Sequence, residues 1–162
     1  MSALVAIAIT TGLLSALWGW LSIALGLLTW AGFLGCTSYF ASSDDSLKGL
    51  GVSLASNLSG VLWGLSLIHG SQWLEHPMLG YLLTGVVAFI MCVQSRQRWL
   101  TFIPGTFIGC CATFAAEGHW QLVVPSLLLG GLFGYLMKRS GLWLKARADG
   151  RAPAADPARQ GG

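Results

Sequence analysis

The first 43 residues of this chain contain no charged side chain. As a helix with about 1.5 Å of rise per residue they would extend about 65 Å, roughly twice the ~30 Å hydrocarbon core of a bilayer. Charged residues make up only 9% of the whole chain, whereas about a quarter of the residues in soluble domains are charged. The sequence therefore excludes a soluble enzyme, a nucleic-acid-binding protein and a disulfide scaffold, and it predicts an integral membrane protein.

Charged and turn-forming residues divide the chain into six apolar stretches, each 17 to 20 residues long. This length suits a transmembrane helix and exceeds the roughly ten residues of a transmembrane β-strand. The first stretch has no basic residues before it, so we expect it to be kept rather than cleaved as a signal peptide. Residues 146–162 are predicted to form a disordered cytoplasmic tail. We predict an all-α integral membrane domain over 1–145, with six transmembrane helices at 4–21, 23–42, 49–68, 78–95, 100–116 and 121–138.

Every Lys and Arg falls on one side of this six-crossing topology. They follow the second, fourth and sixth stretches, at Lys48, Arg96, Arg98, Lys138, Arg139, Lys145, Arg147, Arg151 and Arg159. Because basic residues are concentrated in cytoplasmic loops, both termini are predicted to be cytoplasmic.

The opposite side holds all the histidines and two of the carboxylates. Histidine changes charge between about pH 5 and 8, so this face could sense external acidity and gate a pore. The alternative is that these are solvated loop residues without a role. The residues concerned are His69, Glu75, His76, Glu117 and His119.

The chain also resembles itself. Residues 33–41 align with 107–115 at an offset of 74, with Phe, Gly, Cys, Phe and Ala identical. At an offset of 70, Ser56, Gly60 and Gly64 correspond to Ser126, Gly130 and Gly134. A repeat of three helices must enter the membrane from opposite sides in its two copies, which predicts inverted repeats at 4–68 and 78–138. Such folds often place a solute pathway at the repeat interface, beside interrupted helices.

Two polar features lie inside the predicted spans. Pro104 removes a backbone N–H from the fifth stretch and is expected to kink or break that helix, either lining a pore or simply bending. Asn57 carries an amide that suits contact with a small neutral polar solute, although bonding between helices is the alternative. Around these features we name as candidates to line or shape a pathway Trp30, Phe33, Asn57, Pro104, Thr106 and Phe107.

No Asp, Glu, Lys, Arg or His is predicted at membrane depth. Ion-coupled transporters and proton relays rely on such groups, so a passive conduit is the more reasonable chemistry. The four cysteines lie in apolar stretches without metal-binding spacing, and we expect neither a metal nor another cofactor. No set of nucleophile, base and orienting group lies on facing spans, so we expect no enzyme.

Several segments resemble the YcdZ-type bacterial inner-membrane proteins, a family of unknown function. They are residues 7–12, 18–20, 25–37, 102–109 and 140–144, so the resemblance covers about residues 4–145. It implies a bacterial inner-membrane location and a shared fold, but no activity. In plan alone, two three-helix halves with titratable outer loops are also similar to acid-gated urea channels.

These features together predict a channel or facilitator for a small, mostly uncharged solute such as urea, an amide or a weak acid. We expect the protein to work in the lipid bilayer as a homo-oligomer and to bind no nucleic acid. The alternative is a membrane subunit that transports nothing and binds or organises a partner protein.

Overall fold

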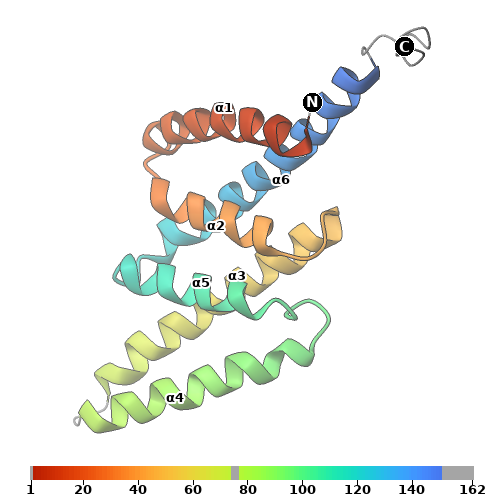
Figure 1. Ribbon diagram of the computed structural model, residues 1–162. Helices are drawn as coiled ribbons and strands as arrows, with labels where there is room; N and C mark the ends of the chain where they lie inside the picture. The colour runs from red at the N-terminus through yellow and green to blue at the C-terminus, as the bar shows by residue number, and fades with distance from the viewer. Residues whose placement is uncertain (1, 74–76, 151–162) are drawn as a thin grey trace, which may run out of the picture.

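The computed structural model describes residues 2–73 and 77–150. All the regular secondary structure in these residues is helical, as expected. Figure 1 labels the α-helices. The elements in chain order are α1 (Ala3–Ala24), α2 (Thr29–Ala41), α3 (Leu47–Gln72), α4 (Pro77–Val93), the 3-10 turn η1 (Gln94–Arg96), α5 (Ile103–Ala115) and α6 (Trp120–Gly150).

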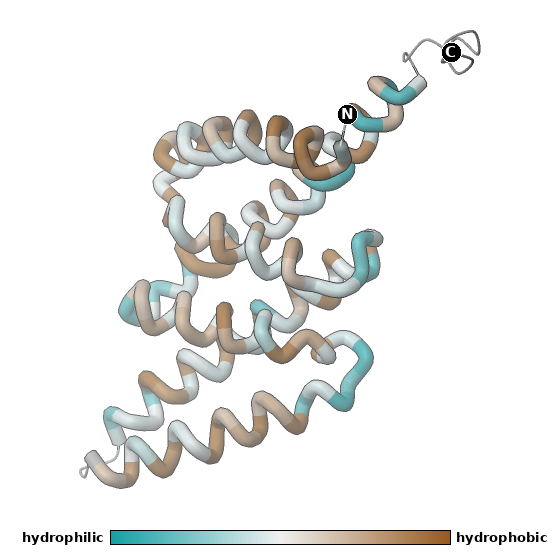
Figure 2. Tube along the Cα trace, in the orientation of Figure 1, coloured by the Kyte–Doolittle hydropathy of each residue, from teal (hydrophilic) through white to brown (hydrophobic). Residues whose placement is uncertain are grey.

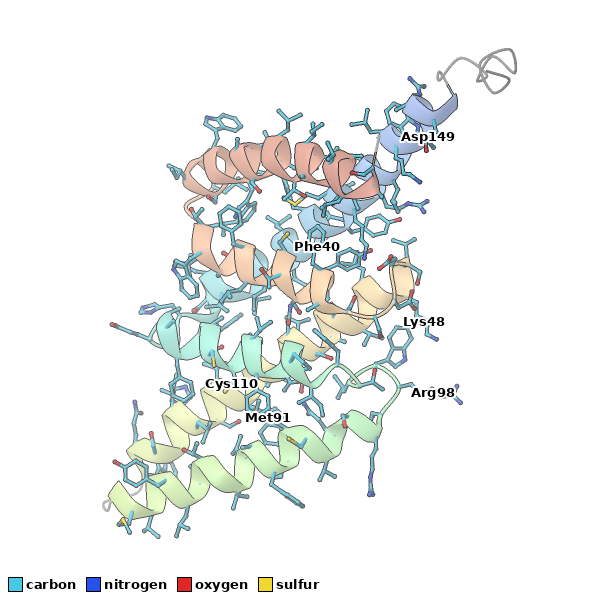
Figure 3. All side chains as sticks on the ribbon, in the orientation of Figure 1. Phe40, Lys48, Met91, Arg98, Cys110 and Asp149 are labelled. Atoms are coloured by element: carbon cyan, nitrogen blue, oxygen red, sulfur yellow. The ribbon has the colours of Figure 1, made fainter. Side chains whose placement is uncertain are left out.

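The helices lie across the molecule in a stack (Figure 1). Helix α1 forms one end of the stack, α2 and α6 follow, then α5 and α3, and α4 forms the other end. The start of α1, the α2–α3 and α4–α5 connections and the end of α6 lie on one side, while the α1–α2 and α5–α6 connections lie on the opposite side. Figure 2 shows hydrophobic residues along the helices and hydrophilic ones gathered at connections and at the end of α6. Lys48 and Arg98 lie on the same side as Asp149 (Figure 3).

Four helical segments are long and apolar enough to cross a membrane: α1, α3, α6 and 78–96. Helices α2 and α5 have 13 residues each, so each is about 20 Å long, shorter than the ~30 Å hydrocarbon core. The structure is that of an integral membrane protein. The predicted spans at 23–42 and 100–116 are only partly helical.

Helix α2 begins only at Thr29 because the chain turns at Gly26, directly after the end of α1. Gly26 has a φ of +64°, and the Leu27 N–H donates to the Ser22 carbonyl at 2.8 Å. This is the left-handed glycine closure common at helix C-termini, where a residue without Cβ is favoured. Residues 25–28 therefore form a turn instead of continuing a helix.

Pro104 does not kink a helix: of the two predicted effects, the structure shows an interruption, because the apolar stretch 100–116 becomes helical only at Ile103. Pro104 stands in the first turn of α5, where the missing N–H would have no partner inside the helix and the fixed φ of proline is favourable. Pro104 thus sets where the helix begins. The proline inside a helix is Pro125, in α6.

Helix α6 extends beyond the predicted sixth span and includes residues 146–150, which we expected to be disordered. An ion pair one helical turn apart joins Lys145 and Asp149 at 3.7 Å, and the Arg147 guanidinium lies 4.0 Å from the centre of the Trp143 ring. Contacts of both kinds stabilise an exposed helix end. The rest of the predicted tail, 151–162, lies outside the described residues.

Glycines bring α2 and α6 into direct backbone contact. A Cβ added to Gly35 would lie 2.3 Å from the Leu127 carbonyl oxygen, and one added to Gly130 would lie 1.9 Å from the Gly32 carbonyl oxygen. In a bilayer, where both solvent and side chains are apolar, close approach through small residues is a main source of helix association. These glycines are packing residues.

A second interface joins α3 and α5 in the same way. A Cβ on Gly109 would lie 1.9 Å from the Asn57 carbonyl oxygen, and one on Gly60 would lie 1.9 Å from the Thr106 carbonyl oxygen. Each of these positions corresponds to a position of the α2–α6 interface at the sequence offsets of 74 and 70. The aligned segments therefore make equivalent contacts.

We predict that Gly60→Ala destabilises the fold by about 1–3 kcal/mol or more, because its methyl group would overlap the Thr106 carbonyl and force the helices apart. The matched control is Gly85→Ala in α4, where an added Cβ would meet no atom within 4 Å. Alanine favours helix over glycine by about 1 kcal/mol, so this control should be neutral or stabilising. Thermal unfolding in detergent, followed by tryptophan fluorescence, measures both. Equal midpoints for the two variants would contradict the packing role.

Candidate functional site

Three fully buried side chains form a polar cluster between α2 and α3, which we call the serine–asparagine cluster: Ser38, Ser53 and Asn57. The Ser38 hydroxyl donates to Asn57 Oδ1 at 2.8 Å. The oxygens of Ser38 and Ser53 are also 2.8 Å apart. Since a hydroxyl has one proton to donate and Ser38 gives it to Asn57, Ser53 donates to Ser38. The chain of donors ends on the Asn57 carbonyl.

The nitrogen of the same amide has no hydrogen-bond partner. Asn57 Nδ2 and the neighbouring Ser56 Oγ are both buried and unpartnered in the part of the chain that the structure describes. Leaving a buried polar group unpaired costs about 1–3 kcal/mol, so such pairs of groups call for water or a ligand. The two N–H bonds of the Asn57 amide and the Ser56 hydroxyl therefore remain without a partner among the described residues.

The cluster lies against the first turn of α5. From the position that a Cβ would take on Gly105, Asn57 Oδ1 is 3.1 Å away and Cδ1 of the Phe102 ring is 2.7 Å away. The Asn57 amide and the Phe102 ring therefore both lie against Gly105, where the backbone of α5 carries no side chain. Only a glycine at position 105 leaves room for both.

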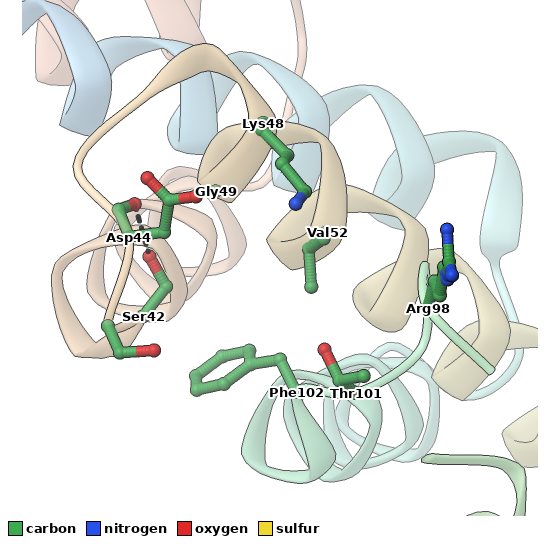
Figure 4. Close-up of a pocket in the computed structure, with 9 residues that line it drawn as sticks. Ser42, Asp44, Lys48, Gly49, Val52, Arg98, Thr101 and Phe102 are labelled. Carbon is green, nitrogen blue, oxygen red and sulfur yellow. Dashed lines mark hydrogen bonds between the residues drawn. The ribbon is translucent and has the colours of Figure 1, made fainter. Parts of the chain in front are cut away.

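Phe102 also lines a pocket of about 530 Å³, which we call the vestibule. It opens between the α2–α3 connection and the segment before α5. In Figure 4 the Phe102 ring points toward Ser42, with Thr101 beside it and Lys48 on the facing wall. The lining residues are Ser42, Ser43, Asp44, Lys48, Gly49, Val52, Arg98, Thr101 and Phe102.

The vestibule carries charges of both signs. Asp44 Oδ1 accepts a hydrogen bond from the Ser46 N–H at 2.9 Å. Hydrogen bonding by the side chain and backbone of Ser46, with a smaller effect of the Lys48 charge, lowers the pKa of Asp44 below its ordinary value. Asp44 is thus an anion at neutral pH and faces the cations Lys48 and Arg98.

A second polar group ties α3, η1 and α5 together through Gln94. Its Oε1 accepts from Ser59 Oγ at 2.8 Å and from Trp63 Nε1 at 2.9 Å. Its Nε2 donates to Thr106 Oγ1 at 3.2 Å. Sequence reasoning missed Gln94, although an amide at the end of an apolar stretch is the same signal that singled out Asn57. Thr106, one of the pathway candidates, is held in this network.

The six pathway candidates do not come together. Asn57 and Thr106 are fully buried, whereas Trp30, Phe33 and Phe107 are each about 40% exposed and Pro104 is exposed as well. Exposed aromatic rings on an apolar helix lie where lipid or another protein would contact them. Phe102, which sequence reasoning did not select, lies beside Asn57 at Gly105.

The titratable residues that the structure describes on the opposite face lie in two places: His69 in the last turn of α3, and Glu117 and His119 between α5 and α6. His69, Glu117 and His119 are exposed, and His119 Nδ1 lies 2.8 Å from the Ala116 carbonyl oxygen. Glu75 and His76 lie outside the described residues. Among the residues that the structure describes, no three His, Cys, Asp or Glu side chains gather as a metal site would require.

The comparisons with known proteins agree with the resemblance seen in the sequence. The chain is 60% identical over 149 residues to "Inner membrane protein YcdZ" of Escherichia coli K12, covering 91% of each chain. It is 57% identical over 150 residues to the protein of that name in Salmonella typhimurium LT2, covering 92% of this chain and 94% of the relative. "Uncharacterized protein YahC" of Escherichia coli K12 is 28% identical over 153 residues, covering 87% of this chain and 92% of the relative.

No solved structure matches this chain significantly. The named relatives and the long apolar helices together confirm a location in the bacterial inner membrane. Residues 8–142 match the family described as "Protein of unknown function (DUF1097)". The chain therefore belongs to this family of inner-membrane proteins.

Proposed function

We propose that this protein is a passive channel or facilitator for a small, mostly uncharged solute such as urea, an amide or a weak acid. The observation that carries the proposal is the buried Asn57 amide, whose nitrogen has no partner among the residues that the structure describes. A solute with a carbonyl or hydroxyl oxygen would supply the missing acceptor. The role involves no covalent chemistry.

The chemistry of the interior supports a neutral solute. The buried polar side chains of the described residues are hydroxyls and one amide, and none of them is ionisable at neutral pH. A charged solute would lose its hydration there without gaining an opposite charge, which is costly in a medium of low dielectric constant. Neutral polar molecules lose much less, because hydroxyls and amides replace their water contacts.

We further propose that the chain crosses the membrane six times as two inverted repeats, α1–α3 and α4–α6. The equivalent backbone contacts of the α2–α6 and α3–α5 interfaces support this arrangement. So does the placement of alternate connections on opposite sides of the stack. In this arrangement the short helices α2 and α5 would cross together with the non-helical segments that precede them, as interrupted helices do in other inverted-repeat proteins.

The six-crossing proposal predicts both termini in the cytoplasm, since the basic residues follow the even-numbered spans. A fluorescent protein fused at the C-terminus should fluoresce, and alkaline phosphatase fused there should be inactive because it folds only outside the cytoplasm. Alkaline phosphatase inserted at Gly118, between α5 and α6, should be active. The reverse pattern, or the same result at both sites, would refute this topology.

The solute proposal predicts that purified protein in liposomes speeds the uptake of at least one member of a panel of neutral solutes. Asn57→Leu removes the free N–H groups and should lower that flux about tenfold, equivalent to about 1.4 kcal/mol or one lost hydrogen bond. Vesicle swelling followed by stopped-flow light scattering measures the rate.

The matched control for this assay is Ser59→Ala. Ser59 is on the same helix, but its hydroxyl binds Gln94 rather than the serine–asparagine cluster. Its flux should stay at the wild-type value while thermal unfolding confirms that both variants are folded. No flux above empty vesicles for any solute would remove the channel proposal.

A partner-binding membrane subunit is the second candidate, and the closed glycine interfaces favour it. Backbone contact between α2 and α6 and between α3 and α5 leaves no room for a solute at those crossings. In addition, most residues of α1 and of the span 78–96 are not buried, so their outer faces are free for lipid, a second copy or another protein. Copurification of one stoichiometric partner, together with absent flux, would favour this role.

A further inference from the structure

The Phe102 ring stands between the vestibule and the serine–asparagine cluster. On one side it lines the vestibule, and on the other it lies against Gly105, beside the Asn57 amide. Asn57 itself is fully buried. A molecule that enters the vestibule and moves toward Asn57 therefore meets this ring.

The start of α5 lacks a contact that the start of α2 has. The Leu28 N–H, directly before α2, donates to Ser126 Oγ on α6 at 3.0 Å. At the repeat offsets Leu28 corresponds to Phe102 and Ser126 to Ser56. Yet Ser56 Oγ has no partner among the described residues. The serine that anchors the start of one short helix thus makes no equivalent contact at the other.

We propose that Phe102 is the gate between the vestibule and a binding site for a planar, neutral carbonyl compound of the urea or amide class. When the ring swings into the vestibule, it vacates a flat space over Gly105. A planar amide in that space would have an N–H to donate to Asn57 Oδ1, which lies beside it. Its carbonyl oxygen would be the acceptor that Asn57 Nδ2 and Ser56 Oγ lack among the described residues. This inference rests on the proposed function and names where the solute enters and what it contacts.

The side chains suit the roles proposed for them, with Phe102 as the gate and Ser56 and Asn57 as the groups that bind the solute. The Phe102 ring has no polar group, so moving it breaks no side-chain hydrogen bond. Gly105 has no Cβ, so the space beside it can hold either the Phe102 ring or a ligand, but not both at once. The two unpaired groups, Ser56 Oγ and Asn57 Nδ2, come from adjacent residues of α3 and remain unsatisfied while the ring blocks access.

The test measures access to position 56 directly, without relying on transport. Ser56→Cys places a thiol at the unpartnered hydroxyl in the full-length protein. Its labelling by methyl methanethiosulfonate is followed site by site with mass spectrometry. Adding Phe102→Ala should accelerate labelling about tenfold, because local opening no longer requires the ring to move. Acetamide at saturating concentration should slow it again by occupying the vacated space.

Internal and matched controls are available in the same chain. The native Cys36 and Cys110 are buried, and their labelling rates should not change unless the whole fold loosens. Phe107→Ala removes an aromatic ring from the same helix, but from a side chain that is 40% exposed, and it should leave the rate at position 56 unchanged. Gly105→Ala is a second test variant, because its methyl group would lie 2.7 Å from the Phe102 ring and should displace it.

An unchanged rate in both Phe102→Ala and Gly105→Ala overturns the gate, as does an equal acceleration at Cys36 and Cys110. Absence of protection by acetamide overturns the carbonyl site. These outcomes are separate from those of the vesicle assay. If the wild-type protein conducts and labelling is unaffected, the gate fails alone, and if labelling behaves as proposed without any flux, the channel proposal fails alone.

Discussion

The architecture depends on four glycines at which the backbones of two helices are in direct contact, with no side chain between them. Gly35 and Gly130 bring α2 and α6 together, and Gly60 and Gly109 do the same for α3 and α5. In lipid no hydrophobic driving force distinguishes one helix surface from another, so this shape complementarity decides which faces meet. It also decides which residues of α3 face inward, and so it places Asn57 in the interior.

The same close packing gives the interior its chemistry. Hydroxyls and amides on the inward faces must bond to protein groups, because leaving a buried polar group unpaired is costly. Most do so, through Ser38 in one network and Gln94 in the other. Among the described residues the buried side-chain atoms without a partner are Thr11 Oγ1, Ser56 Oγ and Asn57 Nδ2. The last two lie where α5 begins late and a phenylalanine, rather than a polar group, comes next to α3. The unsatisfied groups and the vestibule are thus two results of one local irregularity.

Much of this fold could be predicted from the sequence, because long charge-free stretches leave few alternatives to helices. The boundaries that differ are set locally, by Gly26 at the end of α1 and Pro104 at the start of α5. The site was harder to predict. A membrane helix is apolar on every side, so hydrophobic periodicity does not show which face is buried, and Trp30, Phe33 and Phe107 proved to face outward. Asn57 was identifiable because its amide is unusual in such a helix, whereas nothing in the sequence distinguished Phe102 from other phenylalanines.

Helix α6 has 31 residues and is about 46 Å long, so it exceeds the ~30 Å hydrocarbon core even when strongly tilted. Its last three turns must stand among lipid headgroups or in water. A rotation of a few degrees at the Gly35–Leu127 contact would be magnified into a displacement of several ångströms at that far end. A spin label or fluorophore at the end of α6 would therefore report whether the two packed interfaces slide past each other while the protein functions.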